Sequence, residues 1–221
     1  MRLSSPVERL FGFDELKLDD DSVLDFWLWS YSILANDPTK GEFAEWMVGK
    51  LLGLNMTPGG RIEGADWDLR TPEGIKIEVK AAAYWQAWKL RNREDGGWRA
   101  ATQADKEKMT PIKFTGLCRA PATGPIAKAD FKADVYVFCL QHEKDPAKWN
   151  GVDLRQWSFF ILPKSKLAET KEARDAKVKT GKLPKSFDLT LAKLEALSHR
   201  MTAVEFRQVA PEMFKSVSSG Q

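Results

Sequence analysis

Residues 133–140 form the run ADVYVFCL, which is apolar at every position except Asp134. A strand with one face in water alternates apolar and polar residues, so this nearly continuous run is typical of a strand covered on both faces. Residues 157–162, WSFFIL, form a second such run, and Pro163 should end it because proline cannot donate to a ladder. The pattern predicts a central sheet with helices outside it.

The charged residues expected in this sheet lie on a hairpin at 66–80. From Ile75 the chain alternates strictly between apolar and polar residues, as a half-buried strand requires, and the polar side carries Glu78 and Lys80. The connection before this strand, residues 71–74, reads Thr-Pro-Glu-Gly. It has a proline pre-set for a turn and a glycine that can take a positive φ, which is the chemistry of a hairpin loop.

The turn determines which residue faces Glu78. If residues 72–74 form a three-residue loop with the glycine left-handed, counting back along both strands sets Asp68 opposite Glu78. A register shifted by one step on each strand would place Asp66 there, so both aspartates are candidates and Asp68 is preferred. Two carboxylates that face each other across a ladder cost stability unless a cation lies between them.

A helix with two glutamates precedes the hairpin. Thr39 and Glu42 match a capping box, which predicts a helix from there to about Leu52, ended by Gly53. In that box Glu42 reaches back to cap the helix start, whereas Glu45 has no such structural explanation. The alternative for Glu45 is a solvent-facing side chain, alone or paired with a nearby lysine.

Two segments have compositions that suit contact with nucleic acid. Residues 84–113 interleave tryptophans, Trp85 among them, with lysines and arginines, a mix that suits phosphates and stacked bases but also an ordinary exposed excursion. Residues 163–186 carry seven lysines and one arginine against three acids, and their glycine and proline predict a flexible loop. Such a charge run is usually a solvated face, but it is a second candidate surface for phosphates. The net charge of +3 permits nucleic acid without identifying it.

The 221 residues suit a single domain with helical additions at both ends. We expect a short helix at 5–11 and an aromatic-rich helix at 23–35, which we assign to packing, and we expect C-terminal helices at 191–197 and 202–214. The two cysteines are far apart and suggest neither a disulfide framework nor a zinc cluster. The N-terminal residues lack a signal-like apolar core, and no run reaches the roughly 18 apolar residues of a membrane helix. We therefore expect a cytoplasmic protein without a membrane segment.

The order of these features, a helix with Glu45, an acidic hairpin and two buried strands, resembles the PD-(D/E)xK nuclease superfamily. The resemblance covers residues 41–167, with 1–39 as an N-terminal helical extension and 168–221 as a basic loop and C-terminal helices. It implies the restriction-endonuclease-like fold, an α/β core whose mixed central sheet is flanked by helices. One departure from the motif is Trp67, which stands where many members have proline. The stretches 41–54 and 68–86 are also similar to an uncharacterised bacterial group that implies no further function.

The resemblance implies a Mg²⁺-dependent nuclease, with Mn²⁺ as a substitute, that acts on DNA as an endonuclease. It maps the catalytic residues onto Asp68, Glu78, Lys80, Glu45 and Gln86. The metal would be held by Asp68 and Glu78, helped by the backbone carbonyl of Val79 and by Glu45. One site per chain would favour a homodimer for double-strand cutting. The alternatives are a nuclease-fold module that binds nucleic acid or a protein without cutting, and a charged hairpin that is merely solvated.

Overall fold

The computed structural model describes residues 34–57, 65–86, 102–118 without 108 and 110, 130–177 and 187–218, together with positions 24, 27, 30 and 31. Its main elements are α2 (Asp37–Leu51), β1 (Leu69–Arg70), β2 (Lys76–Ala83), α4 (Gln103–Glu107), β3 (Lys113–Phe114), β4 (Val135–Gln141), β5 (Trp157–Pro163), α5 (Lys164–Asp175), β6 (Leu189–Thr190), α6 (Leu191–Glu195) and α7 (Ala203–Ser218). A short 3₁₀ turn, Leu154–Gln156, precedes β5. The expected helix at 5–11 lies outside the described residues. Within them, no helix is long and apolar enough to cross a membrane.

The central sheet has four strands in the order β1-β2-β4-β5. β2 pairs antiparallel with β1 and parallel with β4, while β4 pairs antiparallel with β5. The sheet is therefore mixed, and helices flank it, which confirms the expected α/β architecture at that level. All seven residues of β4 are buried and β4 is an interior strand, as the run at 133–140 predicted.

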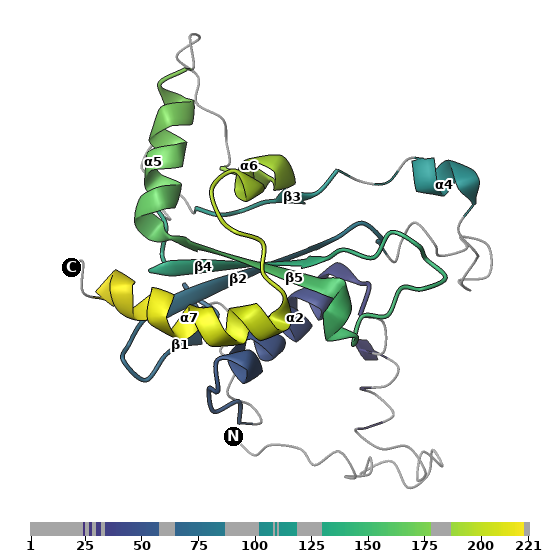
Figure 1. Ribbon diagram of the computed structural model, residues 1–221, viewed down its shortest axis with the longest axis horizontal. Helices are drawn as coiled ribbons and strands as arrows, with labels where there is room; N and C mark the ends of the chain where they lie inside the picture. The colour runs from purple at the N-terminus through teal and green to yellow at the C-terminus, as the bar shows by residue number, and fades with distance from the viewer. Residues whose placement is uncertain are drawn as a thin grey trace, which may run out of the picture.

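Helices cover both faces of the sheet (Figure 1), and the buried apolar side chains form two separate cores, one on each face. On one face, α2 and α7 pack over the side chains of Ile77, Val79 and Val137. On the other face, β3, β6, α5 and α6 cover Phe138 and Phe160. Because successive strand residues point to opposite faces, Glu78, which stands between Ile77 and Val79, points into the second layer. Glu78 is consequently buried.

The hairpin before β2 has the predicted turn. Gly74 takes a φ of 95°, its amide donates to the Thr71 carbonyl at 2.9 Å, and the Thr71 amide donates to the Ile75 carbonyl at 3.0 Å. The strand register pairs Leu69 with Ile77. One further step along this register leads to Asp68 and Glu78, so the loop chemistry read from the sequence is confirmed.

The start of α2 differs from the prediction. The helix begins at Asp37 with Asn36 as its N-cap, and the Lys40 amide donates to the Asn36 carbonyl at 2.8 Å. Proline is well placed in a first helical turn because its missing N–H has no partner there, so Pro38 shifts the start ahead of Thr39. Glu42 is therefore not the partner of a capping threonine, and the prediction that explained it as a cap is wrong. The helix does end before Gly53, whose φ is 71°.

Later elements are partly as expected. β3 pairs with β6 in a separate two-stranded sheet. The predicted helix at 202–214 is present as α7, and it begins with a capping box, because the Thr202 amide donates to Oε2 of Glu205 at 2.7 Å and the Glu205 amide donates to Oγ1 of Thr202 at 3.3 Å. Both cysteines are free thiols.

The two segments whose composition suited nucleic-acid contact differ in structure from the prediction. The first half of the basic segment is helix α5, not a loop, and its Lys166, Lys171 and Arg174 form ion pairs with acids of the same helix. In the aromatic segment, Trp85 is buried and its indole donates to the Lys144 carbonyl at 3.0 Å, so it is not a stacking platform. Most of the remaining aromatic segment lies outside the described residues.

The aromatic helix at 23–35 is described only at isolated positions. Leu24 and Trp27 are helical there, as is Tyr31. All three side chains are exposed, which contradicts their assignment to packing.

Candidate functional site

Glu78 and Lys80 form the centre of the site. They stand two residues apart on β2 and so project from the same face, which brings Nζ of Lys80 to 2.7 Å from Oε1 of Glu78. Glu78 is only 6 % exposed, and its neighbour across the parallel ladder is Tyr136. Burial, and to a smaller extent the charge of Glu78, hold the pKa of the Tyr136 hydroxyl above its usual value. The Glu78 carboxylate thus sits in a covered position with one cation beside it.

Asp68 binds the strand on both sides of Glu78. Its amide donates to the Ile77 carbonyl at 2.9 Å, and its Oδ2 accepts from the Val79 amide at 2.7 Å. Burial, followed by the charge of Glu78, raises the pKa of the Asp68 carboxyl to about 7, against the lowering effect of the Val79 bond and of Lys80. Asp66 is exposed and has no such contact with the strand, so Asp68 is the aspartate that the structure brings to Glu78.

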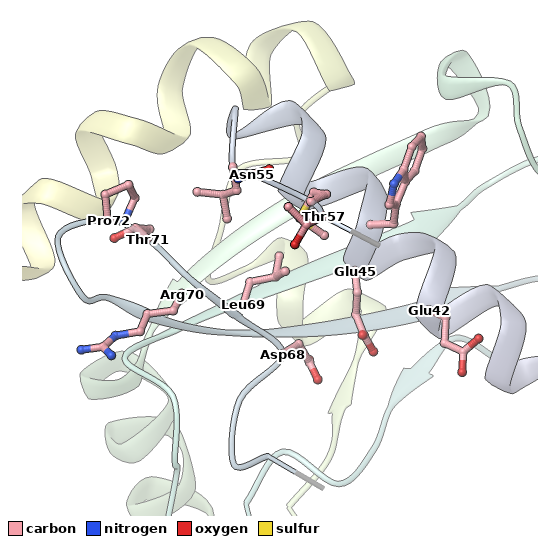
Figure 2. A pocket seen from close by; sticks show the side chains of 12 residues that line it. Glu42, Glu45, Asn55, Thr57, Asp68, Leu69, Arg70, Thr71 and Pro72 are labelled. Atoms are coloured by element: carbon pink, nitrogen blue, oxygen red, sulfur yellow. The ribbon is translucent and has the colours of Figure 1, made fainter. Parts of the chain in front are cut away.

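The α2 helix adds Glu45 to this group. The negative charge of Glu45 contributes to the raised pKa of Asp68, which places the two carboxylates within electrostatic reach. In Figure 2, Glu45 and Asp68 point into the same space from the helix and from the start of β1, and Glu42 points the same way from an earlier turn. Of the predicted set, Glu45, Glu78 and Lys80 thus each lie within electrostatic reach of Asp68.

Glu42, Glu45 and Asp68 line a cavity of about 670 Å³ between α2 and the hairpin, whereas Glu78 and Lys80 do not belong to its lining. Trp46, which is 49 % exposed, and Arg70 also line it. Nε of Arg70 donates to the Gly74 carbonyl at 3.3 Å, so its guanidinium lies at the hairpin turn and points away from Asp68 (Figure 2). The complete lining is Glu42, Glu45, Trp46, Leu54, Asn55, Met56, Thr57, Asp68, Leu69, Arg70, Thr71 and Pro72. Met56 packs directly against the backbone of Gly49, one turn after Glu45. A Cβ on Gly49 would stand 2.3 Å from Sδ of Met56, so the thioether can lie this close only because residue 49 is glycine.

Gln86 lies apart from the carboxylates. Its Oε1 accepts from Nζ of Lys40 at 3.1 Å and its Nε2 donates to the Ala83 carbonyl at 3.3 Å. At about 3.3 Å of rise per residue, Ala83 stands about 16 Å along β2 from Glu78. Gln86 is thus placed at the start of α2 and not beside the acidic pair.

Lys40 is the residue that sequence reasoning missed. It is 3 % exposed, and its ammonium also donates to Oδ1 of Asp37 at 2.6 Å. A signal for its burial exists in the sequence, because Lys40 shares the i, i+4, i+7 spacing of the buried Ala44 and Met47. Trp46 and residues 54–57 gave no comparable signal, since only folding brings them to the hairpin.

The oxygen donors of this group suit Mg²⁺, which is usually held by one or two carboxylates and keeps several waters. Asp68 and Glu78 supply the carboxylates, and the raised pKa of Asp68 reflects negative charge that a cation would offset. Because backbone groups two residues apart in a strand point the same way, the Val79 carbonyl faces the β1 side like that of Ile77, which bonds Asp68. Among the described residues, no three His, Cys, Asp or Glu side chains are grouped to hold an ion, so backbone and water would complete the shell.

Comparison of the whole sequence found no matching family model and no similar curated protein. Function is therefore inferred from the side chains of the site. The strongest element of that inference is the covered acidic pair Asp68 and Glu78 with the ammonium of Lys80 beside it.

Proposed function

We propose that the protein is a Mg²⁺-dependent nuclease that hydrolyses phosphodiester bonds in DNA as an endonuclease. The observation that carries the proposal is the convergence of Asp68, Glu78 and Lys80, in which the pKa of Asp68 is raised to about 7. Phosphodiester hydrolysis requires charge neutralisation on the phosphate and a positioned water. Covered carboxylates next to a lysine can supply both requirements, whereas a solvated charged hairpin would leave Asp68 in water with an ordinary pKa.

Asp68, Glu78 and the Val79 carbonyl would hold the metal, with Glu45 holding a water of its shell. When bound, Mg²⁺ or Mn²⁺ would neutralise charge on the phosphate oxygens and increase the acidity of bound water. Asp68 must be ionised to act as a ligand. Its raised pKa means that metal binding near neutral pH would release a proton from this side chain.

Lys80 supplies the mobile positive charge of the site. One of its three N–H groups is used by Glu78, and the side chain is 25 % exposed, so the others can reach water or a phosphate oxygen. We assign Lys80 to orienting the attacking water and to offsetting charge on the phosphate.

The cavity beside the carboxylates provides the contact with the substrate strand. Trp46 offers an exposed indole face for a base or sugar, and Arg70 offers a guanidinium for a phosphate. Gln86 contacts Ala83, which stands about 16 Å along β2 from Glu78, and it also accepts from Lys40. We therefore assign Gln86 and Lys40 to the DNA backbone beyond the scissile phosphate. Cutting both strands with one such site per chain would require a symmetric dimer.

The decisive experiment compares cleavage of supercoiled, linear and single-stranded DNA by the native chain and by Lys80→Ala, with Mg²⁺ or Mn²⁺. We expect Lys80→Ala and Glu78→Ala to lose about 100-fold or more of the activity while DNA binding in EDTA persists. Lys76→Ala is the matched control, because Lys76 stands on the same face of β2 but lies over the Trp67 ring at 4.4 Å. Unchanged cleavage by both Lys80→Ala and Glu78→Ala would refute the proposal.

The direct ion pair between Lys80 and Glu78 favours a second candidate, a module that binds nucleic acid without cutting. In this reading the lysine neutralises its neighbour permanently and no cation is needed. The module would show salt-sensitive DNA binding, with no cleavage under any divalent ion.

A further inference from the structure

A second cavity, of about 830 Å³, opens where the first turn of α7 meets the start of β5 and the end of α2. Its size falls in the range of small-molecule sites, roughly 300–1,000 Å³. The lining is Leu51, His142, Leu154, Arg155, Trp157, Ser158, Arg200, Met201, Thr202, Ala203, Val204 and Arg207. None of these residues lines the cavity beside Asp68, so this is a separate hollow of the molecule.

One wall of this cavity is a connected polar group. Nε of Arg200 donates to Oγ of the buried Ser158 at 2.9 Å, and that Oγ lies 2.8 Å from Nδ1 of His142. Burial, followed by the charge of Arg200, lowers the pKa of His142, so the imidazole is neutral at pH 7. Oγ of Ser158 accepts from the guanidinium, and its bond with Nδ1 runs in the direction that the imidazole tautomer sets. Ser158 thus holds Arg200 and His142 in place, with donors left over.

The charge on this wall is positive. Arg155 is offset by Asp153, which accepts from its Nε at 2.9 Å and its Nη2 at 2.8 Å. Glu195 lies 3.7 Å from Nη1 of Arg200, a loose pairing between two half-exposed side chains. Arg207 has no ion-pair partner among the described residues. Glu143 adds a negative charge within electrostatic reach of His142. Two guanidinium groups, those of Arg200 and Arg207, therefore border one cavity, and Arg207 is the one without an acidic partner among the described residues.

The rest of the lining is apolar. Leu51, Trp157, Met201 and Ala203 line it from α2, β5 and the start of α7, and Val204 adds an exposed isopropyl group. A ligand that matches both parts has a flat or apolar body and one group of high negative charge. Guanidinium groups suit phosphate geometry, and two of them balance the near −2 charge of a phosphomonoester better than the −1 of a carboxylate.

We propose that this cavity binds a nucleoside monophosphate, as a free nucleotide or as the phosphorylated 5′ end of an oligonucleotide. The phosphate contacts Arg200 and Arg207, and the nucleoside covers the apolar residues. The assignment rests on this cavity alone and does not require cleavage at the carboxylates.

Isothermal titration calorimetry of the full chain with AMP in EDTA tests the assignment, since EDTA removes divalent ions that could recruit phosphate to Asp68 and Glu78. We expect saturable binding of one AMP per chain, weakened about tenfold by Arg207→Ala. Lys215→Ala is the matched control, because it removes one cation from the far end of the same helix. Arg200→Ala should weaken AMP similarly, and its melting curve shows whether that variant is folded.

Absence of saturable AMP binding would overturn the proposal, and so would adenosine binding as tightly as AMP or Arg207→Ala leaving the affinity unchanged. Loss of AMP binding in Glu78→Ala would place the ligand at the carboxylates and refute it as well. Two oligonucleotides, with a 5′ phosphate and with a 5′ hydroxyl, identify the source of the phosphate. A preference for the phosphorylated one assigns the cavity to a strand end, and equal affinity, with AMP still bound, assigns it to the free nucleotide.

Discussion

Oδ2 of Asp68 lies 2.7 Å from the backbone nitrogen of Val79, on the strand that carries Glu78. This hydrogen bond favours the ionised carboxylate, but burial and the charge of Glu78 oppose it, and the pKa of Asp68 ends at about 7. Near neutral pH the side chain is therefore divided between its protonated and ionised forms. When the protonated form binds Mg²⁺ and loses its proton, the total charge of the site rises by only one unit instead of two.

The pKa of Asp68 predicts how stability depends on pH. Its value is 3.8 in an unfolded chain and about 7 in the fold, so the folded state holds the proton more tightly. The contribution of Asp68 to stability is therefore full below about pH 4 and is lost as the pH rises to about 7. We expect Asp68→Asn, which stays neutral and keeps an acceptor for Val79, to raise the melting temperature at pH 8 by a few degrees, on the order of 1 kcal/mol. Melting curves from pH 4 to 8 check this, and identical curves for both chains would contradict it.

Metal binding should reverse that loss. At pH 8 we expect Mg²⁺ at about 100 times its dissociation constant to stabilise the native chain by about 2.7 kcal/mol, because an ion that binds only the folded state shifts the equilibrium. EDTA should remove the effect, and Glu78→Gln should abolish it. Glu212→Gln, on the surface of α7, serves as the control and should keep the full shift. A shift that survives Glu78→Gln would place the ion elsewhere.

The two glutamates of α2 should differ in their effect on cleavage. Glu45 acts electrostatically on Asp68, so we expect Glu45→Gln to slow cleavage by about 10- to 100-fold and to move the acidic limb of the pH–rate profile to lower pH. Glu42→Gln should have a smaller effect and leave that limb in place. Single-turnover cleavage rates from pH 5 to 9 measure both effects. Equal shifts for the two variants would remove the special role of Glu45.

The loop that aligns the acidic residues should depend on one glycine. Gly74 has a φ of 95°, which an L side chain adopts only with strain, so Gly74→Ala should cost about 1–2 kcal/mol. Gly41 lies inside α2 with open space around it, and Gly41→Ala should stabilise the fold by about 0.5–1 kcal/mol. Urea unfolding of both variants gives the two values. The same sign for both would mean that the turn is not as described.

Trp46 should contribute to the binding of single-stranded DNA. Its indole is 49 % exposed on the cavity beside the carboxylates, and loss of one stacked base costs about 1–3 kcal/mol. We expect Trp46→Ala to weaken binding about tenfold in EDTA and Trp46→Phe to restore most of it. Fluorescence anisotropy with a labelled oligonucleotide measures this. A duplex and a single strand that respond equally to Trp46→Ala would argue against stacking.

The features that could be predicted from sequence are those that local chemistry decides. The loop before Ile75 follows from one proline and one glycine, and the α7 start follows from Thr202 and Glu205. The burial of β4 follows from its composition alone. In each case the residues that determine the structure are within a few positions of the residues that adopt it.

The error at the start of α2 is local: Pro38 fits the first helical turn, so Asn36 and not Thr39 is the N-cap, and Glu42 lines the cavity. The other errors concern contacts between distant parts of the chain. Phe114 pairs with Leu189, and no pattern in the nearby sequence predicts this partner. Gln86 contacts Lys40 because α2 packs beside the end of β2. The short spacing between Lys80 and Gln86 in the sequence did not reveal this contact.

The pairing of β1 with β2 stops at Leu69, and beyond it a carboxylate oxygen of Asp68 occupies the Val79 amide as a peptide carbonyl would. An edge strand with unpaired amides can pair with a strand of another molecule, and charged groups at that edge discourage such pairing. A foreign chain that extended β2 here would have to displace an anion held by its own hydrogen bond. Among the described residues, the Asp68 carboxylate thus occupies a β2 amide with which a strand of another molecule could otherwise pair.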